Sequence, residues 1–179
     1  KETSPTVVDE LVPNILTYGD VQRVLQNLLR ERVSVRNLEV IIETLCDYGR
    51  RTKDLDVLTE YCRHALAREI SATYADEDRT LRVVTVAPDI EQEILRAAQQ
   101  SEGDYVPLAP ERADAIGDAT LHAVNPLLLE GHEAVVLTSA PVRRFFRRVI
   151  TRYLPKIIVL SYNEIDPAKR LESVGQISV

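Results

Sequence analysis

The feature of this sequence most suggestive of binding chemistry is an arginine-rich segment near the C-terminus, which contains Arg143, Arg144, Phe145, Phe146, Arg147, Arg148 and Arg152. On a helix, residues four apart share a face, so Arg143 and Arg147 form one basic ridge, and Arg144, Arg148 and Arg152 form another. This surface predicts docking of an acidic partner or a phosphate, with Arg143, Arg147 and Phe146 as the candidate contacts. The competing interpretation is a solvated helix face whose phenylalanines, Val149 and Ile150 pack on a sheet.

Ser139 lies between a predicted strand and a predicted helix, which is the position of the nucleophile in several hydrolases. Its turn, Thr138-Ser139-Ala140-Pro141, lacks the flanking glycines that such a strained turn requires, and no histidine is spaced to be its partner. The same junction contains neither GxGxxG nor GxxxxGK[ST], so it does not predict a phosphate-binding loop. The sequence therefore predicts neither an enzyme nor a bound cofactor.

The cysteines and histidines do not form a metal-ligand pattern. Cys46 and Cys62 lie on separate helical patterns, and His64, His122 and His132 are scattered along the chain. We predict two reduced core cysteines, with a disulfide as the alternative. Paired carboxylates such as Asp54 and Asp56 stand in predicted first helical turns, where they stabilise the positive end of the helix. No metal site is expected.

Composition excludes some classes of partner. The formal net charge of −6 argues against a nucleic-acid-binding module, which needs a basic footprint. Among the 179 residues, 45% are hydrophobic and 28% are charged, which is typical of a folded chain with one domain or two small ones. No apolar run approaches the ~20 residues that span a bilayer, so no membrane contact is expected. The chain starts at Lys1 and contains no methionine, so we expect a fragment or a processed product.

The stretch 24–45 organises the N-terminal part of the chain. It predicts two amphipathic helices, with apolar residues at helical spacing in each: Val24, Leu25, Leu28 and Leu29, then Leu38, Ile41, Ile42 and Leu45. Ser34 is the predicted N-cap of the second helix. We expect the short connection to place the two helices side by side, with their apolar stripes facing a common core.

Further helices are predicted on both sides of this pair. The first covers 4–11, with Ser4 as N-cap, and the next is capped by Thr17 with Asp20 and extends to about Arg32. Gly49 is the expected left-handed helix stop. Another helix begins at Asp54 or Thr52 and extends to Ile70. Residues 1–75 are therefore predicted to be an all-helical subdomain of about four short helices.

The pattern changes after the charged segment 75–79. Predicted strands cover 81–86, 134–138, 157–160 and 171–179. Predicted helices cover 89–100 with Asp89 as cap, 110–129, and 141–153, with a loop at 101–104 and a kink or split caused by Pro126 near Val124. The second and third strands are expected to be parallel neighbours joined by the arginine-rich helix. The fold class is α+β: the helical subdomain, then a small α/β subdomain over 80–179 with a roughly four-stranded sheet.

Three stretches carry a family resemblance: LQNLLRERVSVRNLEVIIETL, TKDLDVLTEYCRHALAREI and IIVLSYNEI. They resemble the C-terminal cytoplasmic region of the FlhA/LcrD family, the export-gate proteins of flagellar and virulence type III secretion systems. The resemblance implies the last two of the four cytoplasmic subdomains of such a protein, located at the cytoplasmic face of the bacterial inner membrane. The sequence segments SYNEI and LLRERVSVR favour the flagellar branch of the family. The alternative is a virulence (injectisome) homologue.

The resemblance also implies partners. Tails of this family assemble into a closed ring of about nine copies and receive export chaperone–substrate complexes, the export ATPase complex and the specificity-switch protein. Because the helical subdomain packs ring neighbours in this family, Arg30, Arg32 and Arg36 are the predicted inter-subunit contacts. The alternatives from other classes are a small α/β nucleotide-binding or enzymatic domain and a nucleic-acid module built on the arginine-rich helix.

Overall fold

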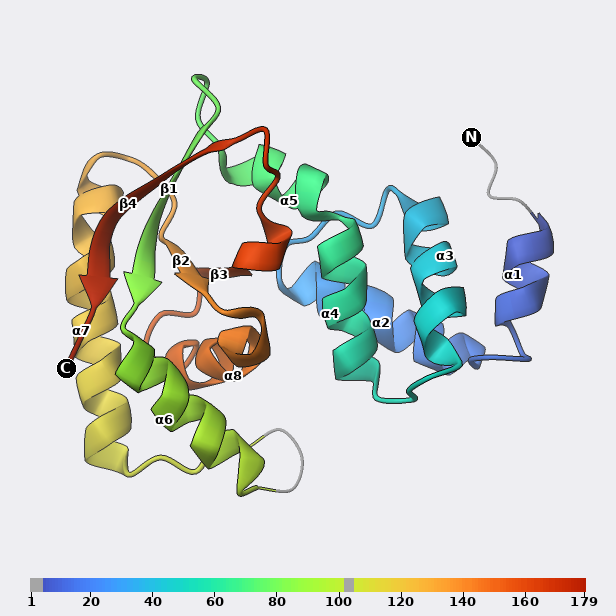
Figure 1. Cartoon of the computed structure of the whole chain (residues 1–179), viewed down its shortest axis with the longest axis horizontal. Coiled ribbons are helices and arrows are strands. Elements are labelled where there is room, and N and C mark those ends of the chain that lie inside the picture. The colour runs from blue at the N-terminus through green and yellow to red at the C-terminus, as the bar shows by residue number, and fades with distance from the viewer. Residues whose placement is uncertain (1–4, 102–104) are drawn as a thin grey trace. The chain divides into compact units, whose positions relative to one another are not determined.

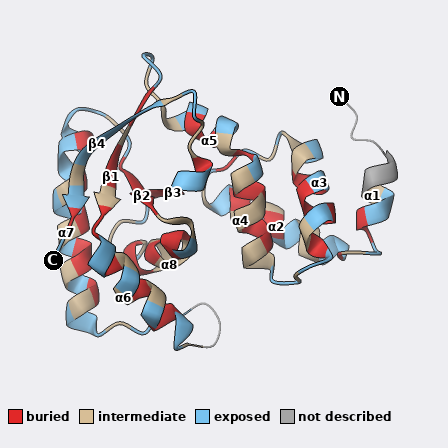
Figure 2. Cartoon of the chain, viewed as in Figure 1, coloured by how far each residue is buried: buried red, intermediate tan, exposed pale blue. Residues whose placement is uncertain are grey.

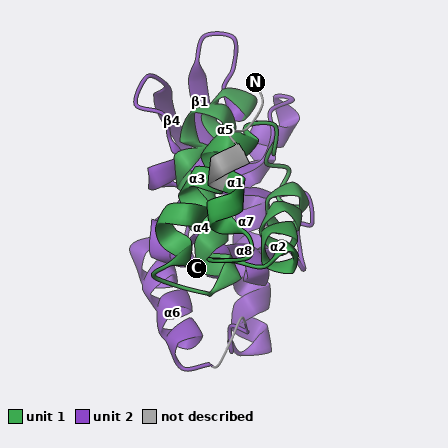
Figure 3. Cartoon of the chain, turned by 90° about the vertical axis from the view of Figure 1, so that its right-hand side faces the viewer, with its two compact units in different colours: residues 1–73 green, residues 74–179 purple. Residues whose placement is uncertain are grey.

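The computed structural model describes residues 5–101 and 105–179. The chain divides into two compact units, residues 1–73 and residues 74–179 (Figure 3). The predicted cap Ser4 and positions 102–104 of the predicted loop lie outside the described residues. That the units are separate domains with the bounds 1–75 and 80–179 stays a prediction.

The described part of unit 1 is helical, and Figure 1 shows its elements in blue and green: α1 (Pro5–Leu11), α2 (Tyr18–Arg30), α3 (Leu38–Gly49), α4 (Leu55–Ala65) and α5 (Ala67–Tyr74), which ends at the boundary with unit 2. The single helix predicted from Asp54 to Ile70 is thus two helices. They meet at Leu66, whose φ of −93° and ψ of 15° leave the helical region. Leu66 itself is fully buried, so the break keeps its side chain in the core.

Helix α4 is the centre of unit 1. It packs closely against both α2 and α3, whereas those two helices have little direct contact with each other. The buried residues on the three helices include Leu28, Leu45 and Leu58. The expectation that α2 and α3 lie side by side is therefore wrong, because the connection at 31–37 is long enough to separate them.

The predicted helix ends are partly confirmed. The Thr17 side chain accepts from the backbone N–H of Asp20 at 3.1 Å, and the Asp20 carboxylate accepts from the backbone N–H of Thr17 at 2.9 Å. These two bonds form the capping box. Ser34 is not the cap of α3, because Asn37 holds that position and the Ser34 hydroxyl accepts from the N–H of Arg36 instead.

Gly49 has a different role from the predicted one. It is the last residue of α3, followed by Arg50 with a right-handed helical backbone, so it is not a left-handed stop. A Cβ atom at this position would lie 2.8 Å from Cγ2 of Ile15. Glycine is needed here because the segment before α2 crosses closely over the end of α3.

Unit 2 contains a parallel sheet of four strands in the order β3-β2-β1-β4. Along the chain its elements are β1 (Thr80–Val86), α6 (Pro88–Gln99), α7 (Pro110–Leu129), β2 (Val135–Thr138), α8 (Ala140–Ile150), β3 (Ile158–Ser161), the 3₁₀ helix η1 (Tyr162–Glu164) and β4 (Arg170–Ile177). The predicted parallel pairing of β2 with β3 through the arginine-rich helix is confirmed. Helix α7 continues through Pro126 as one helix, so no split occurs. Asp89 is not the cap of α6, because Ala87 holds that position.

One face of the sheet carries the core of unit 2. Val84, Val136 and Val159 are register partners on adjacent strands and therefore share a face. They belong to one buried cluster with Ile90 of α6, Ile116 of α7 and Phe146 of α8, so these three helices pack on that face. Figure 2 shows buried residues concentrated on β1 and β2 and exposed residues along β4, which is an edge strand.

Candidate interaction surfaces

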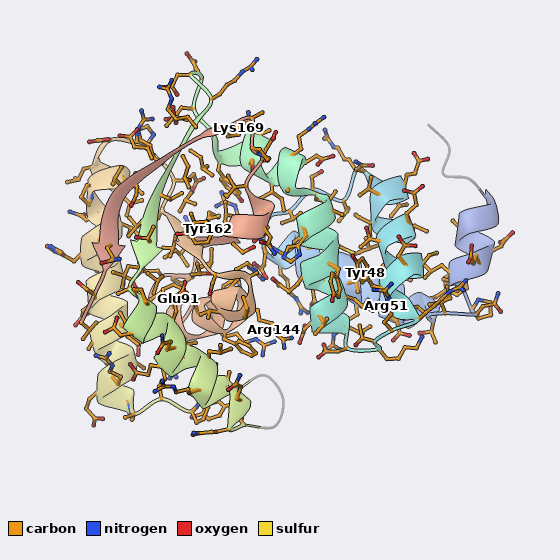
Figure 4. All side chains as sticks on the ribbon, in the orientation of Figure 1. Tyr48, Arg51, Glu91, Arg144, Tyr162 and Lys169 are labelled. Carbon is orange, nitrogen blue, oxygen red and sulfur yellow. The ribbon has the colours of Figure 1, made fainter. Side chains whose placement is uncertain are left out.

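The residues with catalytic potential have structural explanations. The backbone N–H of Ser139, between β2 and α8, donates to Oε1 of Glu91 at 2.8 Å; Glu91 is labelled in Figure 4. His132 stands seven residues before Ser139, and its Nδ1 lies 3.4 Å from Oδ1 of Asp76. Within residues 5–101 and 105–179, no group of three or more His, Cys, Asp or Glu side chains is arranged to hold a metal ion.

Both cysteines are buried free thiols, as the interpretation without a disulfide requires. Burial raises the pKa of Cys62 to about 12 and also raises the pKa of Cys46. A thiol with a raised pKa holds little thiolate at neutral pH, and the thiolate is the reactive species. Neither cysteine is suited to nucleophilic or redox chemistry.

We therefore predict that neither cysteine reacts readily with Ellman's reagent at pH 8 in the folded protein, since both thiols are protonated and shielded. The absorbance at 412 nm should stay near the baseline until denaturant is added, and should then rise to two equivalents because the chain has two cysteines. The variant C46S isolates Cys62, the more deeply buried thiol. Fast labelling of Cys62 in the folded C46S protein would contradict the prediction.

The connection between α2 and α3 brings three predicted contact residues together. Arg30 ends α2, Arg32 follows with a left-handed φ of 61°, and Arg36 stands just before α3. All three side chains are exposed. Arg30 Nη1 donates to Oδ1 of Asn27 at 3.4 Å, within its own helix. This segment of unit 1 therefore carries three exposed arginines, which we call the connection arginines.

A buried ion pair fixes this connection. Nη1 of Arg63, on α4, donates to Oε2 of Glu31 at 3.1 Å, and the side chains are only 2% and 16% exposed. Glu31 is the C-cap residue of α2. The Arg63–Glu31 ion pair therefore holds the start of the α2–α3 connection against α4. Sequence reasoning missed Arg63. The available signal was its spacing, because Thr59, Arg63 and Leu66 recur at four- and three-residue steps and all three are buried.

An aromatic group on unit 1 was also missed. The rings of Tyr48 and Tyr61 are stacked with centroids 3.8 Å apart, and the guanidinium of Arg51 lies 5.6 Å from the Tyr48 centroid. Figure 4 shows Tyr48 and Arg51 together at the end of α3. Tyrosine and arginine are enriched in protein–protein interfaces. Tyr61 is 13 residues from Tyr48 and belongs to another helix, so its stacking on Tyr48 could not be predicted from spacing.

Some of the residues of the arginine-rich helix are buried, so only part of the helix lies at the surface. Arg143 is 1% exposed, donates from Nη1 to the carbonyl of Val159 at 3.2 Å, and has Nε 3.9 Å from Oε2 of the buried Glu164. Phe146 is fully buried in the core cluster. The predicted surface position of Arg143 and Phe146 is therefore wrong, because both point to the sheet side of α8.

The remaining arginines of this segment lie closer to solvent. The guanidinium carbon of Arg144 lies over the Phe145 ring, 4.6 Å from the ring centroid. Arg144 is labelled in Figure 4. Arg147 and Arg148 are half-buried and Arg152 is exposed. Phe146 and Ile150 join the core on the sheet, as the competing interpretation expected. The arginines of this segment that reach the surface of unit 2 are thus Arg144, Arg147, Arg148 and Arg152.

Comparison with known proteins places the chain in a family. Residues 1–170 match the model of the FHIPEP family. The chain is 42% identical over 180 residues to flagellar biosynthesis protein FlhA of Bacillus subtilis, covering 100% of this chain and 27% of that protein. It is 36% identical over 172 residues to invasion protein InvA of Salmonella typhimurium, covering 94% of this chain and 25% of that protein. The chain belongs to the FHIPEP family, the export-gate proteins of flagellar and virulence type III secretion.

Solved structures of related proteins share the fold. The nonameric SctV-C of enteropathogenic Escherichia coli (EPEC) superposes with a TM-score of 0.85 at 32% identity, over 96% of this chain and 52% of that one. The Chlamydia pneumoniae CdsV protein in complex with CdsO superposes with a TM-score of 0.88 at 31% identity, over 98% and 51%. This chain thus spans about a quarter of the curated relatives and about half of these solved chains. No helix among the described residues is both long and apolar enough to cross a membrane.

Proposed function

We propose that this chain is the C-terminal cytoplasmic part of a flagellar type III export gate, which helps to form the cytoplasmic ring and to dock export partners. The observation that carries the proposal is the 42% identity to a flagellar FlhA along the entire chain. A docking and assembly role, rather than catalysis, agrees with the surfaces of exposed cations and aromatics described above. The proposed location is the cytoplasmic face of the bacterial inner membrane.

Ring formation is supported by two observations. A structurally similar chain, SctV-C of EPEC, is nonameric. On this chain, the connection arginines are exposed, and the Arg63–Glu31 pair ties the backbone of their segment to α4 at Glu31. We propose that Arg30, Arg32 and Arg36 contact a neighbouring copy in a ring of the same kind.

The variant R36E, made in the full-length protein, is expected to weaken ring assembly. Reversing an exposed charge at an interface turns attraction into repulsion, so the concentration for half-assembly should rise about fivefold or more. Mass photometry of the detergent-solubilised full-length protein measures that concentration. R23E is the matched control, because Arg23 is exposed on the same α2 but lies outside the connection. Normal ring assembly by R36E would contradict this contact.

Docking is supported by the complex of the similar CdsV protein with CdsO. We propose that chaperone–substrate complexes, the export ATPase complex and the specificity-switch protein bind the whole cytoplasmic tail. The test compares this chain with the tail extended to its membrane boundary, each presented to a purified flagellar chaperone–substrate complex in surface plasmon resonance. Binding by the long form supports the proposal. Binding by this chain as well places a receptor surface on residues 1–179, whereas binding by neither contradicts the docking role.

A virulence export gate is the second candidate. The observation in its favour is the 36% identity to InvA over 94% of this chain. The two candidates differ in cargo, so the chaperone used in the same binding experiment separates them. Binding of a virulence chaperone in preference to a flagellar one would move the assignment to the virulence branch.

A further inference from the structure

Unit 2 contains a hollow of about 230 Å³ on the side of the molecule where α7 begins and α8 ends. Val106 and Leu108, from the segment before α7, form one wall of the hollow. Its apolar floor consists of Ala113 of α7 and Val149 of α8. Val106 and Leu108 also pack against the core cluster, so that wall is anchored to the interior of the unit. A concave, mostly apolar hollow with a few polar groups is the usual form of a binding site.

Tyr153 gives the hollow a fixed shape. Its hydroxyl donates to Oδ1 of Asp114 at 2.7 Å, and both residues line the hollow. A Cβ atom at Gly117 would lie 2.7 Å from Cγ of the Tyr153 ring, so the ring rests directly on α7 at a position where only glycine leaves room. The wall is therefore built by close packing and one hydrogen bond, which favours a site formed before any ligand arrives.

Two of the residues that line the hollow are cationic and one is anionic. Arg148 and Arg152 both line it, and Arg152 is exposed. The one carboxylate among the lining residues, Asp114, already accepts the hydrogen bond from Tyr153. Guanidinium groups bind carboxylates with paired, directed hydrogen bonds. The hollow thus offers an apolar floor beside cationic groups, which suits an apolar side chain with a carboxylate next to it.

We propose that this hollow is an anchor site for a protein partner, and that it takes a leucine-like side chain whose neighbouring Asp or Glu pairs with the exposed Arg152. The inference rests on the proposed docking role of this chain, and adds the place and chemistry of one contact. The occupant is a peptide segment rather than a free anion, because apolar surface from three separate segments lines the hollow.

The test uses the ¹⁵N-labelled chain and three short peptides followed by amide chemical shifts. Acetyl-Asp-Leu-Leu-Asp-amide is expected to shift the signals of Ala113, Val149 and Tyr153. It should bind about fivefold or more tightly than acetyl-Asp-Gly-Gly-Asp-amide or acetyl-Lys-Leu-Leu-Lys-amide, which lack the apolar and the acidic part respectively. R152E should weaken binding by about the same factor. R96E, an exposed arginine of α6 outside the hollow, should leave it unchanged.

Three results would overturn the proposal: shifts located elsewhere on the chain, equal binding of the three peptides, or unchanged binding by R152E. Equal binding of the two acidic peptides would identify a simple anion site instead. G117A provides a second measurement, because displacement of the Tyr153 ring should weaken the acidic leucine peptide while the rest of the amide spectrum stays folded. Failure of these peptides would leave the docking of whole chaperone–substrate complexes intact, so the two proposals are tested separately.

Discussion

The variant R143M is expected to lower the free energy of unfolding of unit 2 by about 3–5 kcal/mol. Arg143 is the buried cation of α8, and its partner Glu164 is 0% exposed. Methionine fills much of the same volume but leaves the Glu164 carboxylate without its counter-ion in the interior. Removing one member of a buried ion pair is costly because the remaining charge is neither solvated nor paired.

Urea denaturation monitored by circular dichroism measures this effect. The control is R144M on the neighbouring residue, where the arginine stacks over Phe145 near solvent and the loss should stay within about 1 kcal/mol. The double variant R143M/E164Q should recover part of the loss, because the glutamine leaves no buried charge. Equal stability of R143M and R144M would show that Arg143 is solvated, contrary to the fold described here.

The variant F146A is expected to destabilise unit 2 by a similar amount, about 3–5 kcal/mol. Phe146 is fully buried in the cluster that joins α8 to Val136 and Val159 of the sheet. Truncation to alanine removes the apolar contacts of the ring and leaves a cavity that the packed sheet can fill only in part.

Phe145 offers a matched control one position away. It is only partly buried, so F145A should cost clearly less than F146A in the same urea experiment. The pair also tests the interpretation of the arginine-rich helix. If F145A were the more damaging change, the face of α8 that packs on the sheet would be assigned wrongly.

The succession of helices and strands in unit 2 could be predicted from the sequence because each has a local signal. The bounds of α7, Pro110–Leu129, follow from proline at the first helical position and from the apolar repeat. The parallel pairing of β2 with β3 follows from two β-branched runs joined by one helix. These features depend on neighbours in sequence, which is why pattern alone was sufficient.

Side-chain burial on α8 could not be obtained in the same way. Arg143 and Phe146 are three residues apart, and Ile150 follows four later, so all lie on one face. The apolar residues of that face indicate burial. An arginine at position 143 can be buried only if the core also holds a carboxylate to balance its charge. Glu164 is 21 positions away and belongs to a 3₁₀ helix, so no local pattern connects the two residues.

In unit 1 the helix from Asp54 to Ile70 was expected unbroken but is divided at Leu66, and the path of the chain between α2 and α3 was also predicted wrongly. Both α2 and α3 were expected. In the structure each packs against α4, and the two have little direct contact with each other. Arg32 has a left-handed backbone, and the Arg63–Glu31 pair fastens the connection to α4. Neither feature has a strong sequence signal, since arginine is not a residue that usually marks a left-handed turn.

The most direct test of the proposed function is deletion of the gene that encodes this chain, followed by measurement of secreted flagellin in the organism that carries it. The account predicts cells without filaments, with flagellin absent from the medium, and recovery when the intact gene is supplied on a plasmid. Partial recovery with R36E and full recovery with R23E would connect the defect to the connection arginines. Normal filaments and secreted flagellin in the deletion strain would contradict the assignment to the flagellar export gate.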